Sequence, residues 1–405
     1  MTSQRRQSGN AESRTAGLRN TRLVTVGTEQ RDTPLDDAPA APAVPALASA
    51  ELDRLRAAVE SALRSFLTEQ RETLANMAAE LVPVADEVAA VAGAGKRLRP
   101  AFAYWGWRGF VYPDDPTAEA DDAVLRAVAA LELVHSSALV HDDVMDAAVT
   151  RRGRPATHIG FADRHEGDSL DGDGTAFGVG AAILVGDLAL VWSDELLRRS
   201  GISPGALARA RPVWDTMRTE VTAGQYLDLL RAAGGLPGPV GALKVARYKS
   251  AGYTVQRPLQ LGAALACAGP DALDACTAIG LPLGEAFQLR DDVLGVFGDP
   301  EVTGKSADDD LREGKRTLLV ALTEEGTDDA GRALLAEALG NSAAGADELD
   351  GVRSLMTRSG ALRRVEERIA EQTGRARQAI ADAPLAADAR RALDALAVAA
   401  TTRAA

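Results

Sequence analysis

The sequence is poor in aromatic residues and in cysteine, and it has no long apolar run without a charge. Aromatic residues make up 4% of the chain, and the alternation of β-branched and aromatic residues that is typical of strands is scarce, so we expect an all-α fold. The two cysteines, Cys267 and Cys276, are too few for a disulfide framework or a zinc site and indicate a reducing compartment. The best apolar run, residues 177–192, contains Asp187, so we expect no transmembrane segment, and the arginine-containing N-terminus lacks the apolar core of a signal peptide.

Positive charge is also in deficit. The net charge of −13 and the pI near 5.0 argue against a general nucleic-acid-binding surface. We therefore expect a cytoplasmic protein without a nucleic-acid partner, in which a local cluster of basic residues serves a specific anionic ligand.

Residues 1–50 differ in composition from the rest of the chain. They lack Phe, Trp, Tyr, His and Cys and end in a run rich in proline and alanine, so they cannot bury enough apolar surface to offset the entropy of ordering. We predict a disordered tail that is either a passive spacer or a docking segment, whose short apolar patch 23–26 binds a protein partner or a protein shell. From Glu51 onward apolar residues recur at helical spacing, which predicts one helical domain over 51–405. Within it we expect a helix near residues 73–90 and a polar, Gly-rich surface loop at 162–175.

Three aspartates stand at the end of a predicted helix over residues 121–146. On a helix, Asp142 and Asp146 lie one turn apart and Asp143 lies about 100° round. Carboxylates this close repel one another unless a cation neutralises them, and hard oxygen ligands with room for phosphate oxygens are typical of magnesium. His135 lies two turns before Asp142 on nearly the same face, where it is either a core histidine or a phosphate ligand. This stretch therefore predicts a site for a diphosphate bound with magnesium.

Basic residues cluster at two places that flank this motif in the sequence. Lys96, Arg97 and Arg99 stand where a helix begins, and the free N–H groups of a helix start favour a diphosphate, although a basic patch of this length is more often a solvated face. Arg151 and Arg152 follow the aspartates, and paired guanidinium groups bind phosphate oxygens bidentately.

A second acidic pair, Asp291 and Asp292, ends another apolar helical run. Basic residues follow it at Lys305 and Lys315, and Lys249 supplies a further cation between the two acidic motifs. Two acidic pairs on helices, each followed by basic residues, form a much rarer pattern than either pair alone.

These motifs together resemble a known family. The segments GKRLRP, LELVH, HDDVMD, TRRGRPATH, GQYLD, KSAGYT, FQLRDD and GK…DLREGKRT are similar, in order and spacing, to those of the trans-isoprenyl diphosphate synthases, the polyprenyl synthetase family, over about residues 60–400. Geranylgeranyl diphosphate synthases are the most similar members. The resemblance implies an all-α bundle of antiparallel helices around a central cavity, usually a homodimer. It also implies a prenyltransferase that condenses isopentenyl diphosphate with an allylic diphosphate and uses Mg²⁺, three ions per active site.

The resemblance also assigns roles to the candidate residues. The positions that match metal ligands are Asp142, Asp143, Asp146, Asp291 and Asp292. Those that match the isopentenyl diphosphate site are Lys96, Arg99, His135 and Arg152. Those that match the allylic diphosphate site are Arg151, Lys249, Ser250, Gln288, Lys305 and Lys315, of which Arg151, Lys249, Gln288 and Lys305 take the catalytic roles and Gln225 and Asp228 are supporting polar residues.

The reaction so implied begins with charge stabilisation on the departing pyrophosphate by magnesium and the lysines. The allylic C–O bond breaks, the double bond of isopentenyl diphosphate attacks the resulting carbocation, and a proton passes to the pyrophosphate.

Three positions depart from the family pattern. Gly295 stands where a third aspartate is common, Ser250 replaces a threonine, and Asp308 adds a negative charge where glycine is frequent.

Product length is expected to depend on the residues that precede the first aspartate motif. Ser137 and Ala138, five and four positions before Asp142, are small where farnesyl-length enzymes of the family resemble one another in carrying aromatics. Val134 or Leu131 then forms the floor, and Leu131 lies about 16 Å down the helix axis. We predict a product longer than farnesyl diphosphate, namely geranylgeranyl diphosphate.

Two other functions compete with this interpretation. A class I terpene cyclase pairs one aspartate motif with an Asn/Ser/Glu triad, and none of the four asparagines of this chain lies in such a context. A non-catalytic subunit of a heteromeric prenyl synthase usually loses aspartates of the first motif, which is intact here.

Overall fold

The computed structural model describes residues 46–111, 118–299 and 307–402. These residues belong to one compact unit, which spans Pro42–Ala405. Residues 46–50 are helical, so the helical region begins five residues before the expected boundary at Glu51. The predicted disordered tail otherwise lies outside the described residues.

The described residues confirm the all-α prediction, since their only strands are two strands of two residues each, which form one hairpin. The helices, in chain order, are α1 (Ala46–Met77), η1 (Ala79–Leu81), α2 (Val82–Gly93), α3 (Leu98–Phe110), α4 (Asp121–Met145), α5 (Thr157–Gly167), α6 (Gly174–Arg199), α7 (Pro204–Ala232), α8 (Gly238–Val245), η2 (Ala246–Gln256), α9 (Arg257–Leu265), α10 (Pro270–Phe297), α12 (Asp309–Arg312), α13 (Leu318–Gly326), α14 (Asp329–Ala338), α15 (Ala346–Arg358), α16 (Ala361–Asp382) and α17 (Ala387–Thr401). The hairpin strands are β1 (Thr150–Arg151) and β2 (Arg154–Pro155), between α4 and α5.

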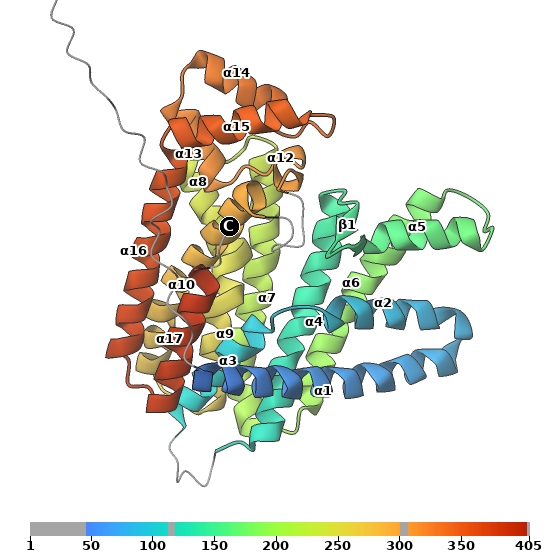
Figure 1. Cartoon of the computed structure of the whole chain (residues 1–405). Coiled ribbons are helices and arrows are strands. Elements are labelled where there is room, and N and C mark those ends of the chain that lie inside the picture. Colours follow the sequence, from blue (N-terminus) through green and yellow to red (C-terminus); the bar gives the residue numbers. More distant parts are fainter. Residues whose placement is uncertain (1–45, 112–117, 300–306, 403–405) are drawn as a thin grey trace, which may run out of the picture. The chain divides into compact units, whose positions relative to one another are not determined.

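The main hydrophobic core surrounds α4. This helix packs along α6 and also contacts α1 and α3, while α3 packs against α9 (Figure 1). Its middle is almost wholly buried, with Leu131 and Leu133 among the largest enclosed side chains. Asp121 and Asp122 lie in its first turn, where negative charge favours the helix dipole.

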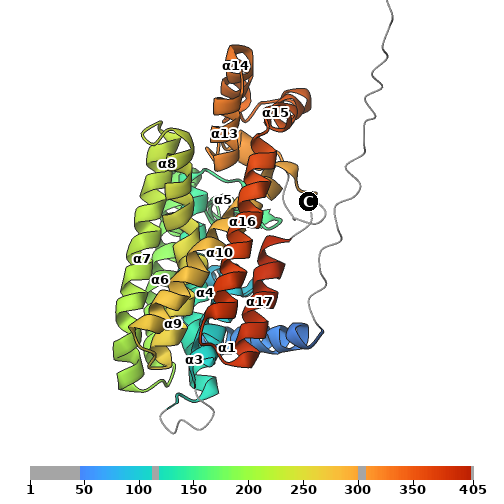
Figure 2. The same ribbon diagram turned by 90° about the vertical axis from the view of Figure 1, so that its left-hand side faces the viewer.

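A second, smaller core joins the end of α10 to helices α12 to α16. It contains Val293 of α10 together with Leu319, Leu349 and Met356. Helices α10 and α16 run side by side, and α10 also packs against η2 (Figures 1 and 2). The two acidic motifs thus lie near the ends of two long helices that are each anchored in a core.

Two local predictions were wrong. The helix expected near residues 73–90 is divided by a turn at Ala78 between α1 and α2, and Pro83 lies at the start of α2, where a proline is tolerated. The loop expected at 162–175 is mostly helical, because α5 extends to Gly167 and buries Phe161 against the main core. Only the six residues from 168 to 173 remain as a turn, and Asp173 caps α6 by accepting from the N–H of Thr175.

Two described helices, α4 and α6, have the length and apolar composition of a membrane span. The apolar stretch of α4 is 72% buried within the fold, as in the core helix of a globular protein. The corresponding stretch of α6 is only 28% buried, which leaves an apolar face of that helix on the surface.

Candidate active site

The first aspartate motif closes α4. Asp146 ends the helix, and its N–H donates to the carbonyl of Asp142, 2.8 Å away, which stacks the two residues one turn apart. The Asp142 carboxylate accepts from Nε2 of Gln225 at 2.7 Å and from Nζ of Lys249 at 2.9 Å, and Lys249 also donates to Asp228 at 2.6 Å. The structure therefore brings Gln225, Asp228 and Lys249 to the first motif.

Asp143 points to a different neighbour from Asp142. Its side chain is buried and accepts from Nε of Arg151 at 2.7 Å and from a second guanidinium nitrogen of the same residue. Arg151 approaches Asp142 only to 3.9 Å. The difference follows from the helix, since adjacent residues are about 100° apart round the axis.

Arg151 and Arg152 are placed by the hairpin between α4 and α5. Thr150 pairs with Pro155 and Arg151 with Arg154, which leaves Arg152 and Gly153 as the two turn residues. Both have positive φ, 54° and 74°, as a type I′ turn requires. The turn directs Arg152 to the segment before α3, where its Nη1 donates to the carbonyl of Ala94 at 2.6 Å.

The three cations of the basic segment before α3 differ in burial and in their partners. Lys96 is exposed, but Arg97 is buried and forms an ion pair with the buried Glu132 of α4, at 2.7 Å. Arg97 also donates to the carbonyls of Ala92 and Gly93, so it fixes the turn that carries Lys96. Of the three cations considered together for a diphosphate at this helix start, Arg97 is therefore engaged within the protein.

Arg99 and His135 meet at Tyr253. Nη2 of Arg99 donates to the Tyr253 hydroxyl at 2.5 Å and to the Thr254 hydroxyl at 3.1 Å, and Nδ1 of His135 lies 2.8 Å from the Tyr253 hydroxyl. Burial lowers the pKa of His135 well below its usual range, and the positive charges of nearby arginines, above all Arg99 and Arg152, lower it further. His135 is thus the neutral centre of a cluster of cations.

Lys249 and Ser250 lie on η2, an eleven-residue π-helix. A π-helix is wider than an α-helix and is frequent at functional sites. It fits between α7 and α10 because glycines face it: a Cβ on Gly224 of α7 would lie 2.3 Å from the Lys249 nitrogen, and one on Gly284 of α10 would lie 2.5 Å from the Ala251 carbonyl oxygen. Ser250 is half-buried beside Lys249.

The second motif lies near the end of α10. Asp292 accepts from Nε2 of Gln288, one turn earlier, at 2.7 Å. Lys315 donates to Asp310 and to Glu313, both at 2.7 Å. Asp291 lies beside Asp292 on the helix, whereas Lys305 is outside the described residues.

Asp310 fills the space beside Gly295, the position that lacks the third aspartate. A Cβ on Gly295 would lie 1.8 Å from a carboxylate oxygen of Asp310, so no larger residue fits there unless Asp310 moves. The same carboxylate helps to raise the pKa of Asp292, which shows that the two acids are close. Asp308, the added negative charge, forms ion pairs with Arg312 and Arg353 and is thereby neutralised.

Lys315 influences the pKa of one aspartate in each motif. Burial and the nearby Asp142 raise the pKa of Asp146 to about 6, and Lys249 and Lys315 act in the opposite direction. Burial raises the pKa of Asp292 to about 7, and Lys315 again opposes the shift. Lys315 therefore interacts with both motifs, and the raised pKa values show that the buried carboxylates have too little positive charge around them. This donor set fits a hard divalent cation.

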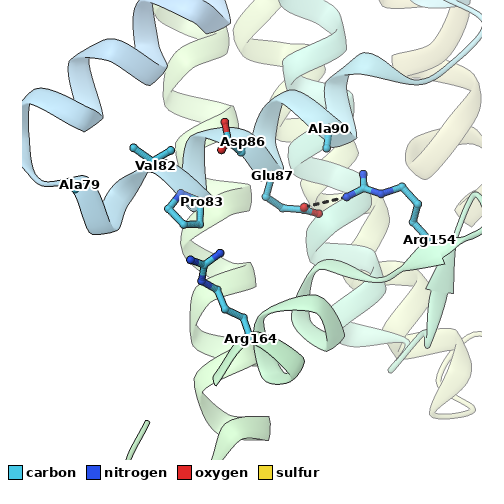
Figure 3. Close-up of a pocket in the computed structure, with 8 residues that line it drawn as sticks. All are labelled: Ala79, Val82, Pro83, Asp86, Glu87, Ala90, Arg154 and Arg164. Atoms are coloured by element: carbon cyan, nitrogen blue, oxygen red, sulfur yellow. Dashed lines mark hydrogen bonds and ion pairs between the residues drawn. The ribbon is translucent and has the colours of Figure 1, made fainter. Parts of the chain in front are cut away.

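The residues expected to set product length all lie on α4. Leu131, Val134 and Ser137 are buried, with exposed fractions of 1%, 2% and 4%, and Ala138 is half-buried. A separate surface cavity of about 600 Å³ is lined by residues of η1, α2, β2 and α5, among them Glu87 and Arg154, and includes none of the aspartates of either motif (Figure 3).

Comparison with known proteins identifies the family. A family model described as Polyprenyl synthetase matches residues 84–356. The chain belongs to the polyprenyl synthetase family. It is 32% identical over 293 residues to the geranylfarnesyl diphosphate synthase of Aeropyrum pernix, over 72% of this chain and 84% of that protein. It is 34% identical over 282 residues to the geranylgeranyl diphosphate synthase of Mycobacterium tuberculosis, over 68% of this chain and 73% of that protein.

The fold agrees with this membership. The geranylgeranyl pyrophosphate synthase from Corynebacterium glutamicum, solved in complex with isoprenyl diphosphate and magnesium, is similar with a TM-score of 0.83 and 38% identity, over 87% of this chain and 99% of that one. The chain is therefore a prenyltransferase with an all-α fold like that of these synthases, as the motifs predicted. The names of its relatives cover products of different lengths, so product length stays a prediction.

Three residues of the site were missed from the sequence. Tyr253 stands within the KSAGYT segment, four positions after Lys249, but was not recognised as the link between Arg99 and His135. Glu132 is the acidic residue of LELVH, and a lone acid in an otherwise apolar helix is a signal for a buried partner. Asp310 opens the DLREGKRT segment, but its relation to Gly295 exists only in the folded chain.

Proposed function

We propose that this prenyltransferase extends an allylic diphosphate with isopentenyl diphosphate to geranylgeranyl diphosphate. The observation that supports the site best is that Lys315 acts on the pKa of both Asp146 of α4 and Asp292 of α10. Two acidic motifs that share a lysine are what a metal-bound diphosphate needs.

We assign the metal ligands as follows. Asp142 and Asp146 share one face of α4 and serve one cation site, and Asp291 and Asp292 serve another, with three magnesium ions in all. Among the described residues, no three acidic, histidine or cysteine side chains lie close enough to hold a metal ion by themselves, so phosphate oxygens and water complete the coordination. Asp143 is already paired with Arg151 and acts by orienting it. Magnesium, when bound, supplies positive charge to the departing pyrophosphate.

The diphosphate of isopentenyl diphosphate is assigned to Lys96, Arg99, His135 and Arg152. The positive charges of Arg99 and Arg152 both act on His135, so these three groups lie around one place. Arg152 and Lys96 are carried by two turns that are joined through the Ala94 carbonyl. One anion can therefore be held by donors from the hairpin, α3 and α4.

The allylic diphosphate is assigned to Arg151, Lys249, Ser250, Gln288, Lys305 and Lys315. Burial acts against the charged form of Lys249, but Asp142 and Asp228 raise its pKa above the usual range, so it stays protonated. The same balance holds for Lys315, which Asp310 and Glu313 keep charged. Both lysines therefore present a fixed positive charge to the pyrophosphate as its C–O bond breaks, and the pyrophosphate takes up the proton lost after condensation.

The test is incubation of the chain with labelled isopentenyl diphosphate, magnesium and each allylic primer in turn, with chromatography of the dephosphorylated products. We expect geranylgeraniol as the main product, and elongation that stops with EDTA and returns with magnesium. Failure to elongate any primer refutes the proposed reaction, and a farnesyl-length product refutes the proposed length alone.

Asp142→Asn provides a variant that keeps the shape of the side chain but removes its charge. We expect turnover to fall by about 10³-fold or more, because charge stabilisation of the leaving group is lost. The control is Asp350→Asn, an aspartate with a side chain 71% exposed in an ion pair with Arg353, which should leave turnover unchanged. Loss of turnover in Asp142→Asn would also exclude the alternative of a non-catalytic subunit. Family membership favours a synthase over a class I terpene cyclase.

We also propose that the chain forms a homodimer through α6. Phe177, Leu184 and Val191 recur every seven residues along that helix and are 43%, 65% and 62% exposed, which gives one apolar stripe on the surface. A second copy buries this stripe. Light scattering should show a dimer that Leu184→Glu with Val191→Glu dissociates, whereas Met77→Glu, at an exposed methionine of α1, leaves it intact.

The cytoplasmic location and the docking role of residues 1–50 also remain proposals, supported by composition alone. A pulldown with the full chain and with a chain that begins at residue 46 distinguishes a docking tail from a passive one, since only a docking tail loses a partner on truncation.

A further inference from the structure

Tyr253 stands between two groups of the proposed isopentenyl diphosphate site. Its hydroxyl oxygen is 2.5 Å from Nη2 of Arg99 and 2.8 Å from Nδ1 of His135. The Arg99 guanidinium also lies over its ring, with Cζ 4.3 Å from the centroid. Tyr253 is 6% exposed, so protein groups provide the hydrogen bonds of its hydroxyl.

The hydroxyl proton has one acceptor among these two partners. A guanidinium group only donates, so Arg99 gives a hydrogen to the Tyr253 oxygen and takes none. The Tyr253 O–H therefore donates to Nδ1 of His135. A neutral imidazole that accepts at Nδ1 carries its own proton on Nε2.

The surroundings maintain this state of His135. Burial and the neighbouring arginines oppose its protonation, as described above. Nε2 of His135 has no hydrogen-bond partner within the part of the chain that the structure describes, and the same is true of the buried Nε of Arg99. Tyr253 thus occupies one nitrogen of His135 and one of Arg99 and leaves other donors of both residues available.

We propose that Tyr253 is a positioning residue that fixes the tautomer of His135, so that Nε2–H donates to the diphosphate of isopentenyl diphosphate. The inference rests on the proposed function, because it assumes that His135 and Arg99 bind this diphosphate. Tyr253 touches neither substrate in this assignment. It acts by deciding which nitrogen of the imidazole carries the proton.

A binding cycle tests the inference. Dissociation constants for isopentenyl diphosphate are measured by calorimetry on the wild type, Tyr253→Phe, His135→Gln and the double variant. The glutamine amide places an N–H near the position of Nε2 and has no tautomer to fix. We expect Tyr253→Phe to weaken binding about tenfold in the wild type, and about twofold or less when residue 135 is glutamine. An equal loss in both backgrounds overturns the inference, because Tyr253 then acts through Arg99 or through packing.

Kinetics add a second criterion. In Tyr253→Phe, KM for isopentenyl diphosphate should rise about tenfold, while kcat and KM for the allylic primer change by about twofold or less. A fall in kcat without a change in that KM contradicts the proposal. Tyr104→Phe is the matched control, since it also removes a tyrosine hydroxyl that makes one hydrogen bond, to Asp121 at 2.8 Å.

The tautomer itself is observable without substrate. The long-range ¹H–¹⁵N spectrum of ¹⁵N-histidine-labelled protein contains four histidines, and the His135→Gln variant identifies the signal of His135. We expect the Nε2–H form in the wild type and a mixture of tautomers in Tyr253→Phe. An Nδ1–H form in the wild type overturns the inference even if the enzyme is active, whereas a wild type that neither binds nor elongates isopentenyl diphosphate refutes the proposed function instead.

Discussion

The buried ion pair between Arg97 and Glu132 makes a quantitative prediction. The two side chains are 2% and 4% exposed, and Nη1 of Arg97 lies 2.7 Å from Oε2 of Glu132. Arg97 stands in the left-handed region, with φ of 56°, and its guanidinium donates to the carbonyls of Ala92 and Gly93. The pair therefore ties the turn before α3 to the middle of α4.

Glu132→Ala removes one partner and leaves the other charge buried. The guanidinium keeps its carbonyl acceptors, but the nearest remaining carboxylate is that of Glu60, 3.8 Å from its Nε. Breaking a buried pair in this way costs about 3–5 kcal/mol of unfolding free energy. Arg97→Met with Glu132→Leu removes both charges, and because Nε of Arg97 and Oε1 of Glu132 lack partners in the wild type, we expect most of that loss to be recovered.

The assay is urea unfolding followed by circular dichroism, at one fixed protein concentration because an oligomer is stabilised by mass action. The control is Asp394→Ala, which removes a partner of Arg377 from a half-exposed pair and should cost less than about 1 kcal/mol. The reasoning is refuted if Glu132→Ala costs no more than this control, or if the double variant is no more stable than Glu132→Ala. The double variant still lacks the bonds that hold the turn, so its KM for isopentenyl diphosphate should remain raised.

Three further substitutions have expected outcomes. Ser137→Phe with Ala138→Phe should shorten the product toward farnesyl diphosphate, and an unchanged product distribution defeats the assignment of the floor. Gly295→Ala places a Cβ 1.8 Å from an oxygen of Asp310 and should weaken magnesium binding, measured by calorimetry, about tenfold; unchanged affinity shows that Asp310 yields without consequence. Lys249→Gln should lower kcat by about 10²-fold and raise KM for the allylic primer, and a normal kcat excludes the assigned role.

Each of these variants has a control within the chain. Ser136→Ala changes a serine next to Ser137 whose hydroxyl only bonds to its own helix, and should not alter product length. Gly374→Ala adds a Cβ on α16 where nothing lies within 4 Å, and should not alter magnesium binding. Lys244→Gln neutralises an exposed lysine of α8 and should leave kcat and KM unchanged.

The sequence predicted what depends on local periodicity and on motif order. The helical class and the helix that carries the first motif followed from spacing and from the family resemblance. The prediction was less accurate where tertiary contacts decide. Arg97 seemed equivalent to Lys96 and Arg99, but a left-handed backbone turns it into the core toward Glu132.

The π-helix is another feature that local pattern does not predict. Its register departs from the 3.6-residue period, so the relation of Tyr253 to Lys249 cannot be read from a helical wheel. It also depends on Gly224 and Gly284 of two other helices, which let η2 approach them closely. Because the π-helix depends on three segments that are far apart in the sequence, none of these segments predicts it alone.

The angular positions of residues round the axis of α4 determine what each of them contacts. Taking Asp142 as zero, His135 and Asp146 lie at about 20° and 40°, on the face that is assigned to the two proposed diphosphate sites. Glu132 and Asp143 lie at about 80° and 100°, and both are buried and paired with an arginine of a neighbouring loop. These two acids, three residues from His135 and one residue from Asp142, thus have another task, which is to hold the loops that carry the basic residues.

An adjoining face of the same helix carries apolar residues. Leu131, Ala138 and Val134 lie at about −20°, −40° and −80° from Asp142, and all are apolar. We expect a prenyl chain whose diphosphate is held at Asp142 to extend along this apolar face rather than toward the ion pairs of Glu132 and Asp143. A change in tail length at Ala138 then need not disturb the charge network at Asp143, because the two residues lie about 140° apart round the helix.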